Sequence, residues 1–185
     1  MNTIITSRDS ILQVCRELIK TQGWSAINIR TVAAKCGVSV GSIYNYFNSK
    51  AELTAAAIES VWHDIFHFPD RDKEFDSFSD CVSWIFDCMR EGNEKYPGFF
   101  TLHSVSFLEE EKTNGKQLME QSWKHIQNQL FLVLTNDRNI RSKAFSEVFT
   151  PEKFVNIVFS LIVSALLQQN YDCSVILELI QRSVY

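Results

Sequence analysis

Residues 36 to 50 read CGVSVGSIYNYFNSK, and this stretch contains residue types that could do chemistry. Gly37, Ser39 and Gly41 fit G-x-S-x-G, the nucleophile elbow that presents a catalytic serine between a strand and a helix. The same spacing suits a tight turn between two helices, with Ser39 as the cap of the second helix. The first interpretation predicts a hydrolytic enzyme, and the second predicts a nucleic-acid-binding module.

Two further sets of residues could bind metal or react with oxidants. His63 and His67 have the i, i+4 spacing that can hold a metal ion, with Asp64 between them. No third ligand is evident nearby, so we expect no metal site and no cofactor. The five cysteines form no C-x-x-C pair, and Cys81 and Cys88 are too far apart on one helix to bond. We expect reduced thiols, with a thiol-based sensor as the alternative.

The elements around Ser39 decide between the two interpretations. Apolar residues recur at helical spacing from 11 to 19 and again from 29 to 36, where Asn28 precedes as a good N-cap. Residues 49–52 have the S-x-x-E pattern of a capping box, which predicts a fourth helix after the short one that Ser39 opens. No strand pattern precedes Ser39, so the elbow lacks its structural context. We therefore interpret Ser39 as a helix cap and expect no enzyme.

The remaining chain continues the helical pattern. Apolar stripes predict helices over 78–89, 99–110, 119–134, 151–169 and 174–184, whereas residues 137–150 have no clear period and fit a loop or a short helix. Only six Gly and three Pro are present, which argues against an architecture of strands and turns. The sequence predicts an all-α fold with about nine helices in total.

The charge is divided unevenly along the chain. Residues 1–54 carry six Lys/Arg and three Asp/Glu, a local charge of +3, whereas residues 55–185 carry 12 and 19, a local charge of −7. The two parts are therefore expected to face different partners. The chain shows no signal peptide and no apolar segment long enough to cross a bilayer, so we expect a cytoplasmic protein and no membrane partner.

The sequence resembles the TetR family of transcriptional regulators. The resemblance rests on Gly23-Trp24, on the stretch from Ile29 to Ser39, and on the stretch from Gly41 to Leu53. It implies an N-terminal three-helix helix-turn-helix DNA-binding domain, residues 1–50, followed by a larger helical effector-binding and dimerisation domain, residues 51–185. Asn28 stands where threonine is common in the family, and no basic arm precedes the first helix.

The resemblance also implies which residues contact double-stranded DNA. Arg30 corresponds to a position that reaches DNA, Val40 and Gly41 to residues that face base edges, and Ser42, Tyr44, Tyr46 and Lys50 to phosphate contacts. Because Val40 and Gly41 offer only methyl contacts, Arg30 and Asn45 are the better candidates for specificity. The alternatives are that the tyrosines pack on the fourth helix and that Arg30 and Lys50 are solvated charges. The expected DNA-binding set is Asn28, Arg30, Ser39, Val40, Gly41, Ser42, Tyr44, Asn45, Tyr46 and Lys50.

Aromatic residues are frequent beyond residue 60, and the resemblance implies a pocket there for a small-molecule effector. An all-α domain can enclose an apolar ligand between facing helices, although aromatic residues at helical spacing also make an ordinary core. His103 is the candidate polar group that would orient a ligand. The expected pocket residues are Trp84, Phe99, His103, Phe107 and Trp123.

The helix expected after Thr150-Pro151 is apolar on more than one face. Such a helix must be buried on all sides, which predicts a homodimer built from the last two helices as a four-helix bundle. The alternative is that it forms the central core helix of a monomer. The expected interface residues are Phe159, Ile162, Val163, Leu166, Ile176 and Ile180.

Together these features predict a ligand-responsive DNA-binding regulator. We expect a repressor that binds an inverted-repeat operator as a dimer and responds to a small, largely apolar effector, although the direction of regulation depends on where the operator lies. The alternative is a coactivator or interaction protein of the same fold that acts through a protein partner.

Overall fold

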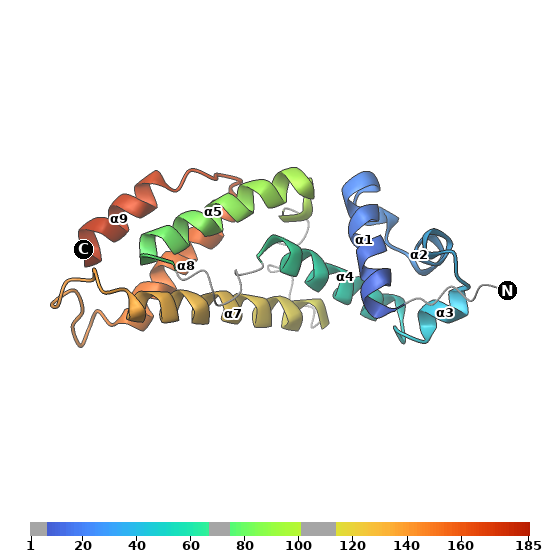
Figure 1. The fold of residues 1–185 in the computed structure, drawn as a ribbon, viewed down its shortest axis with the longest axis horizontal. Helices are drawn as coiled ribbons and strands as arrows, with labels where there is room; N and C mark the ends of the chain where they lie inside the picture. Colours follow the sequence, from blue (N-terminus) through green and yellow to red (C-terminus); the bar gives the residue numbers. More distant parts are fainter. Residues whose placement is uncertain (1–6, 67–74, 101–113) are drawn as a thin grey trace. The chain divides into compact units, whose positions relative to one another are not determined.

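The computed structural model describes residues 7–66, 75–100 and 114–185, with side chains for 7–66, 75–100 and 123–185. All regular secondary structure in these residues is helical, in agreement with the predicted all-α fold (Figure 1). The part of the expected helix at 99–110 that follows residue 100 lies outside the described residues. Residues 137–150 form turns and contain no helix. The helices are α1 (Arg8–Gln22), a 3-10 turn (Trp24–Ala26), α2 (Ile29–Cys36), α3 (Val40–Tyr44), α4 (Lys50–Ile65), α5 (Phe78–Lys95), α7 (Asn114–Asn136), α8 (Pro151–Leu167) and α9 (Ser174–Val184).

The chain divides into two units. The first unit contains Met1–Ile65 and Asn93–Glu120, and the second contains Phe66–Gly92 and Gln121–Tyr185. Helix α4 therefore belongs to the same unit as α1 to α3 and packs on α1. The domain boundary after residue 50 stays a prediction. The last residues of α5 also belong to the first unit.

Local capping interactions explain where the helices of the first unit begin. Ser7 and Ser10 form a reciprocal capping box at the start of α1. At the start of α4, Ser49 Oγ accepts the Glu52 N–H at 3.1 Å, as the S-x-x-E pattern predicts. The Glu52 carboxylate does not complete the box on Ser49. It accepts from the Asn48 N–H at 2.8 Å instead, one residue earlier.

The core of the first unit is built from the apolar faces of α1, α2 and α4. Ile11, Cys15 and Leu18 of α1 are fully or almost fully buried, as are Val32 of α2 and Leu53 of α4. Helix α1 contacts α2 and α4, and α2 packs on α3. This core fixes the position of the short helix α3, which is too short to be stable by itself.

The second unit has a separate core. The Phe78 ring of α5 packs at a tilt against the Phe154 ring of α8 with centroids 5.8 Å apart, and Phe149 contacts the same Phe154 ring at 5.5 Å. The Phe78 N–H donates to the Asp137 carboxylate at 2.8 Å, and the Tyr185 hydroxyl donates to the same carboxylate. The C-terminal end of α9 is thereby held against the start of α5.

Candidate nucleic-acid interface

Ser39 is a helix cap in the structure. Its Oγ accepts the Ser42 N–H at 3.1 Å and lies 2.9 Å from the Ser42 hydroxyl. The segment before it is helix α2, which ends at Gly37 in the left-handed conformation, with φ 68° and ψ 27°. A nucleophile elbow needs a strand at this place. The prediction that Ser39 caps a helix is confirmed.

The start of α2 is held by Asn28. Its Oδ1 accepts the Thr31 N–H at 2.9 Å, and its Nδ2 donates to Thr31 Oγ1 at 2.8 Å. Two polar atoms of a residue expected at the DNA therefore stabilise the helix. Arg30 is exposed in the first turn of α2, where its guanidinium can reach an external partner.

Helix α3 has one buried face and one exposed face. Ile43 and Phe47 are fully buried, and they anchor the helix and the residues after it to the core. Val40 is 40% exposed, Tyr44 48% and Tyr46 36%. Both tyrosines are therefore exposed and are not part of the buried core. Gly41, Asn45 and Lys50 are exposed as well.

The positive charge of this region is distributed over paired and unpaired groups. Lys20 bonds Glu17 at 2.8 Å within α1, and Arg8 lies 3.9 Å from Glu52. Among the described residues, Arg30, Lys35 and Lys50 make no ion pair, and all three are exposed. Lys35 did not stand out in the sequence, because a lysine in an amphipathic helix is usually just a solvated charge. Because Lys35 is exposed and makes no ion pair within the described residues, it is a further candidate contact.

Arg8 supports the end of the helix-turn-helix. Its guanidinium carbon lies 4.8 Å from the centre of the buried Phe47 ring, within the range of a cation–π interaction. The first residue of α1 therefore covers the ring that anchors the chain after α3. Sequence reasoning missed this role, since the two residues are far apart along the chain.

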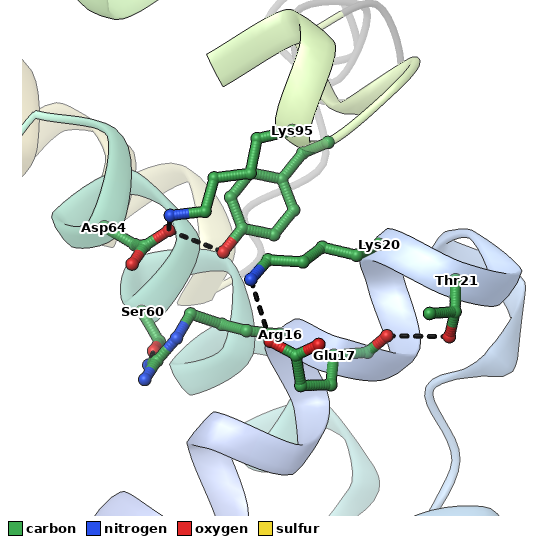
Figure 2. A network of polar contacts seen from close by, with 8 residues as sticks. Arg16, Glu17, Lys20, Thr21, Ser60, Asp64 and Lys95 are labelled. Carbon is green, nitrogen blue, oxygen red and sulfur yellow. Dashed lines mark hydrogen bonds and ion pairs between the residues drawn. The ribbon is translucent and has the colours of Figure 1, made fainter. Parts of the chain in front are cut away.

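A network of polar side chains joins α1 to α4 and to the end of α5 (Figure 2). Arg16 of α1 donates to Ser60 of α4. Asp64 of α4 accepts from the Tyr96 hydroxyl at 2.6 Å and from Lys95 Nζ at 2.6 Å. Lys20 Nζ lies 5.6 Å from the centre of the Tyr96 ring. This network fixes α4 on α1, and α1 in turn packs on α2.

The network shifts the titration of two of its members in opposite directions. Burial raises the pKa of Asp64, but the hydrogen bonds from Lys95 and Tyr96 and the nearby charges outweigh burial and hold that pKa below its ordinary value. Burial, followed by the hydrogen bond to Asp64, raises the pKa of Tyr96 far above that of a free tyrosine. At neutral pH the pair is therefore a carboxylate and a neutral hydroxyl, which is the arrangement that the hydrogen bond requires.

The residues expected to form an effector pocket fall in both units. Phe99 is buried in the first unit, where its ring lies 5.7 Å from that of Trp62 and 6.4 Å from that of Trp24. Trp84 and Trp123 belong to the second unit and are half-buried, in contact with Phe75 and Phe159 respectively. His103 and Phe107 lie outside the described residues. The effector pocket stays a prediction.

Four of the six residues expected at the dimer interface are buried within the chain itself. Phe159, Ile162, Leu166 and Ile180 are between 0% and 8% exposed, because they face the core of the second unit. Val163 and Ile176 are half-buried. The apolar residues that α8 and α9 do expose are Ile157, Leu167, Val175 and Leu179, at 43% to 79%.

The candidate metal and thiol sites gain no support from the described residues. Asp64 is engaged with Lys95 and Tyr96, His67 lies outside the described part, and no metal-binding cluster is found within that part. Burial raises the pKa of the Cys81 and Cys88 thiols to about 12, with smaller contributions from neighbouring carboxylates. A thiol with such a pKa is almost entirely protonated at neutral pH and reacts slowly with oxidants.

The capped turn, the buried Ile43 and the exposed opposite face of α3 all lie in a segment that matches a known protein family. Residues 11–57 match the family described as "Bacterial regulatory proteins, tetR family". In this segment the chain is similar to TetR-family regulators. The fold of the chain is similar to that of solved transcriptional-regulator structures. Within the described residues no helix has the length and apolar character needed to span a membrane.

The similarity to individual known proteins is local in sequence and extensive in fold. The HTH-type transcriptional regulator AlkX of Mycobacterium tuberculosis is 46% identical over 46 residues, which cover 25% of this chain and only 22% of AlkX. A TetR-family regulator structure from Rhodococcus sp. has a TM-score of 0.68 at 17% identity and covers 96% of this chain and 98% of its own. The structure of BioQ with its double-stranded DNA operator has a TM-score of 0.54 at 11% identity, covering 90% of this chain and 87% of its own. At these identities the two structures show the fold alone.

Proposed function

We propose that the protein is a repressor that binds an inverted-repeat DNA operator as a homodimer and releases it when a small, largely apolar effector binds. The observation that carries the DNA-binding part is the exposed set on α2, α3 and the start of α4. Arg30, Lys35 and Lys50 are exposed cations that make no ion pair within the described residues, and Tyr44 and Tyr46 are exposed residues that carry hydroxyl groups. Lysines, arginines and tyrosine hydroxyls are the side chains that hold DNA phosphates.

The arrangement suits a helix-turn-helix in the major groove. In that geometry the first turn of the second helix meets base edges, and hydroxyl and cationic groups near it contact the backbone. Val40 and Gly41 occupy the first turn of α3, and Tyr44 and Lys50 follow. Arg30 and Asn45, both exposed, are the hydrogen-bonding groups that we assign to base readout.

Selection of bound sequences from random DNA, followed by titration with salt, tests this function. Lys50→Ala should weaken binding to all sequences alike and reduce the slope of log K against log salt by about 1. Arg30→Ala should weaken the selected site more than random DNA. Lys143→Ala, which removes an exposed lysine of the second unit, is the matched control and should change neither quantity. Absence of any sequence-specific binding at low salt would refute the proposal and favour the coactivator alternative.

The dimer is supported by the exposed apolar residues of α8 and α9. Ile157, Leu167, Val175 and Leu179 are large side chains left at the surface by the core of the second unit. Exposed apolar residues of this kind can form an interaction surface. In a dimer with two-fold symmetry, this surface of one copy packs against the same surface of the other copy. Light scattering should give about 43 kDa, which is 2 × 21.4 kDa. A monomer at micromolar concentration would contradict the proposal.

The effector part of the proposal concerns the second unit. The second unit keeps Trp84 and Trp123 half-buried, so their rings still present surface that a ligand could cover. A ligand that favours the free protein over the DNA complex must raise the melting temperature and lower DNA affinity together. Screening apolar small molecules for both effects tests the assignment. Molecules that raise the melting temperature without changing DNA affinity would oppose it.

A further inference from the structure

The first turn of α3 offers few hydrogen-bonding side-chain groups. Val40 is 40% exposed, Gly41 has no side chain, and Ile43 is turned into the core. The Ser39 and Ser42 hydroxyls lie 2.9 Å apart and bond each other, and Ser39 Oγ also accepts the Ser42 N–H. The first turn of α3 therefore presents mainly the two methyl groups of Val40, beside the bare backbone of Gly41.

Nothing inside the chain requires a glycine at position 41. A Cβ built there would meet only Ser39 Oγ, at 3.7 Å, which is an ordinary van der Waals contact. The residue lies within helix α3, where alanine is more stable than glycine. Glycine has a low helix propensity, so its presence on an exposed helical face indicates that something outside the chain approaches the backbone closely.

We propose that α3 reads thymine in its operator, with the Val40 methyl groups packed on the C5-methyl group of a thymine and Gly41 allowing the helix to come close enough. This inference rests on the proposed DNA-binding function and names the base that the site recognises. In the major groove, thymine presents a methyl group that none of the other three bases carries. An apolar side chain without hydrogen-bonding atoms can distinguish bases there only by that methyl group.

The proposal assigns different kinds of base contact to different residues. Arg30 and Asn45 are exposed and carry hydrogen-bonding groups suited to purine edges. Val40 and Gly41 carry none, so the positions that they face must be specified by shape. The operator should therefore contain, in each half-site, at least one thymine whose methyl group matters more than its hydrogen-bonding edge.

Deoxyuridine provides the test, because it pairs as thymidine does and lacks only the C5-methyl group. Each thymine of the selected operator is replaced in turn, and the affinity of the wild-type protein is measured. At the position facing Val40, removal of one buried methyl should weaken binding about fourfold. Val40→Ala should bind the thymine operator more weakly and lose its sensitivity to deoxyuridine at that position only.

Val148→Ala is the matched control, since Val148 is 80% exposed in the second unit, and it should keep the full sensitivity to the methyl group. Thermal melts of both variants establish that each is folded. Sequence-specific binding that is indifferent to every deoxyuridine replacement would overturn the inference and leave the proposed function intact. Sensitivity that persists in Val40→Ala would overturn the assignment to Val40. Failure of the wild type to bind any operator would instead overturn the proposed function.

Discussion

Replacing Gly41 by alanine should make the protein more stable and weaken its binding to DNA. Position 41 lies in helix α3, and a Cβ there meets only Ser39 Oγ at 3.7 Å. The substitution should therefore gain the difference in helix propensity, about 0.5–1 kcal/mol. For a chain of this size that gain corresponds to a rise of about 1–4 °C in melting temperature.

The effect on DNA binding should have the opposite sign. If the bare backbone of Gly41 lies against a base edge, the added methyl group overpacks the interface, at a cost of about 1–3 kcal/mol. That cost corresponds to binding about 5-fold to 150-fold weaker. Calorimetry measures the stability, and fluorescence anisotropy with the selected operator measures the affinity.

Gly23 provides the contrast that makes the result interpretable. Its backbone has φ 79° and ψ 176°, a region that only glycine adopts readily. Gly23→Ala should therefore destabilise the fold by about 1–3 kcal/mol, and its folded fraction should bind DNA normally. Gly41→Ala binding the operator as tightly as the wild type would refute the idea that DNA approaches this backbone. A loss of stability in Gly41→Ala would refute the helical geometry on which the idea is based.

Three further predictions concern the polar network and the surface of α8. Tyr96→Phe keeps the buried ring but removes the hydroxyl that donates to Asp64 at 2.6 Å, so urea unfolding should show a loss of about 1.5–3 kcal/mol. The pKa of Asp64 is lower in the folded than in the unfolded chain, so the ionised carboxylate stabilises the fold fully above the unfolded pKa of about 4, and this stabilisation is lost as the pH falls through the folded pKa. The free energy of unfolding of Asp64→Asn should therefore depend less on pH in that acid range than that of the wild type. An unchanged pH profile would contradict the shift. Leu167→Glu should give a folded monomer by circular dichroism and light scattering, since Leu167 is 55% exposed. Leu166→Glu should not fold, because Leu166 is only 5% exposed and the change would bury a carboxylate. Two equally folded variants would argue against this assignment of the exposed and buried faces of α8.

The local features of the DNA-binding region could be predicted from the sequence because each depends on neighbouring residues. The caps at Asn28 and Ser39 and the left-handed Gly37 each involve partners within a few positions. Helical periodicity also separated the buried Ile43 and Phe47 from the exposed face. The caps and the helical periodicity each depend on residues within a single turn or a single helix.

Contacts between distant residues could not be predicted in the same way. Asp64 and Tyr96 are 32 positions apart, and the sequence pattern around either residue does not predict that the two are in contact. Periodicity also fails for a helix that is apolar on several sides, since it does not say which side faces the chain's own core. For this reason Phe159 and Leu166 were expected at an interface, yet they are buried within the second unit.

The way in which Trp62 and Asp64 are held has a consequence for the construction of chimeric regulators. Asp64 bonds Tyr96 and Lys95, and the Trp62 ring lies 5.6 Å from Phe100, so α4 depends on residues about 30 positions further along the chain. A transplant of residues 1–66 onto a foreign sensor would leave a carboxylate and an indole without these partners. The proposed DNA-binding module of this protein is therefore discontinuous in sequence, and a functional graft must bring residues 95–100 with it.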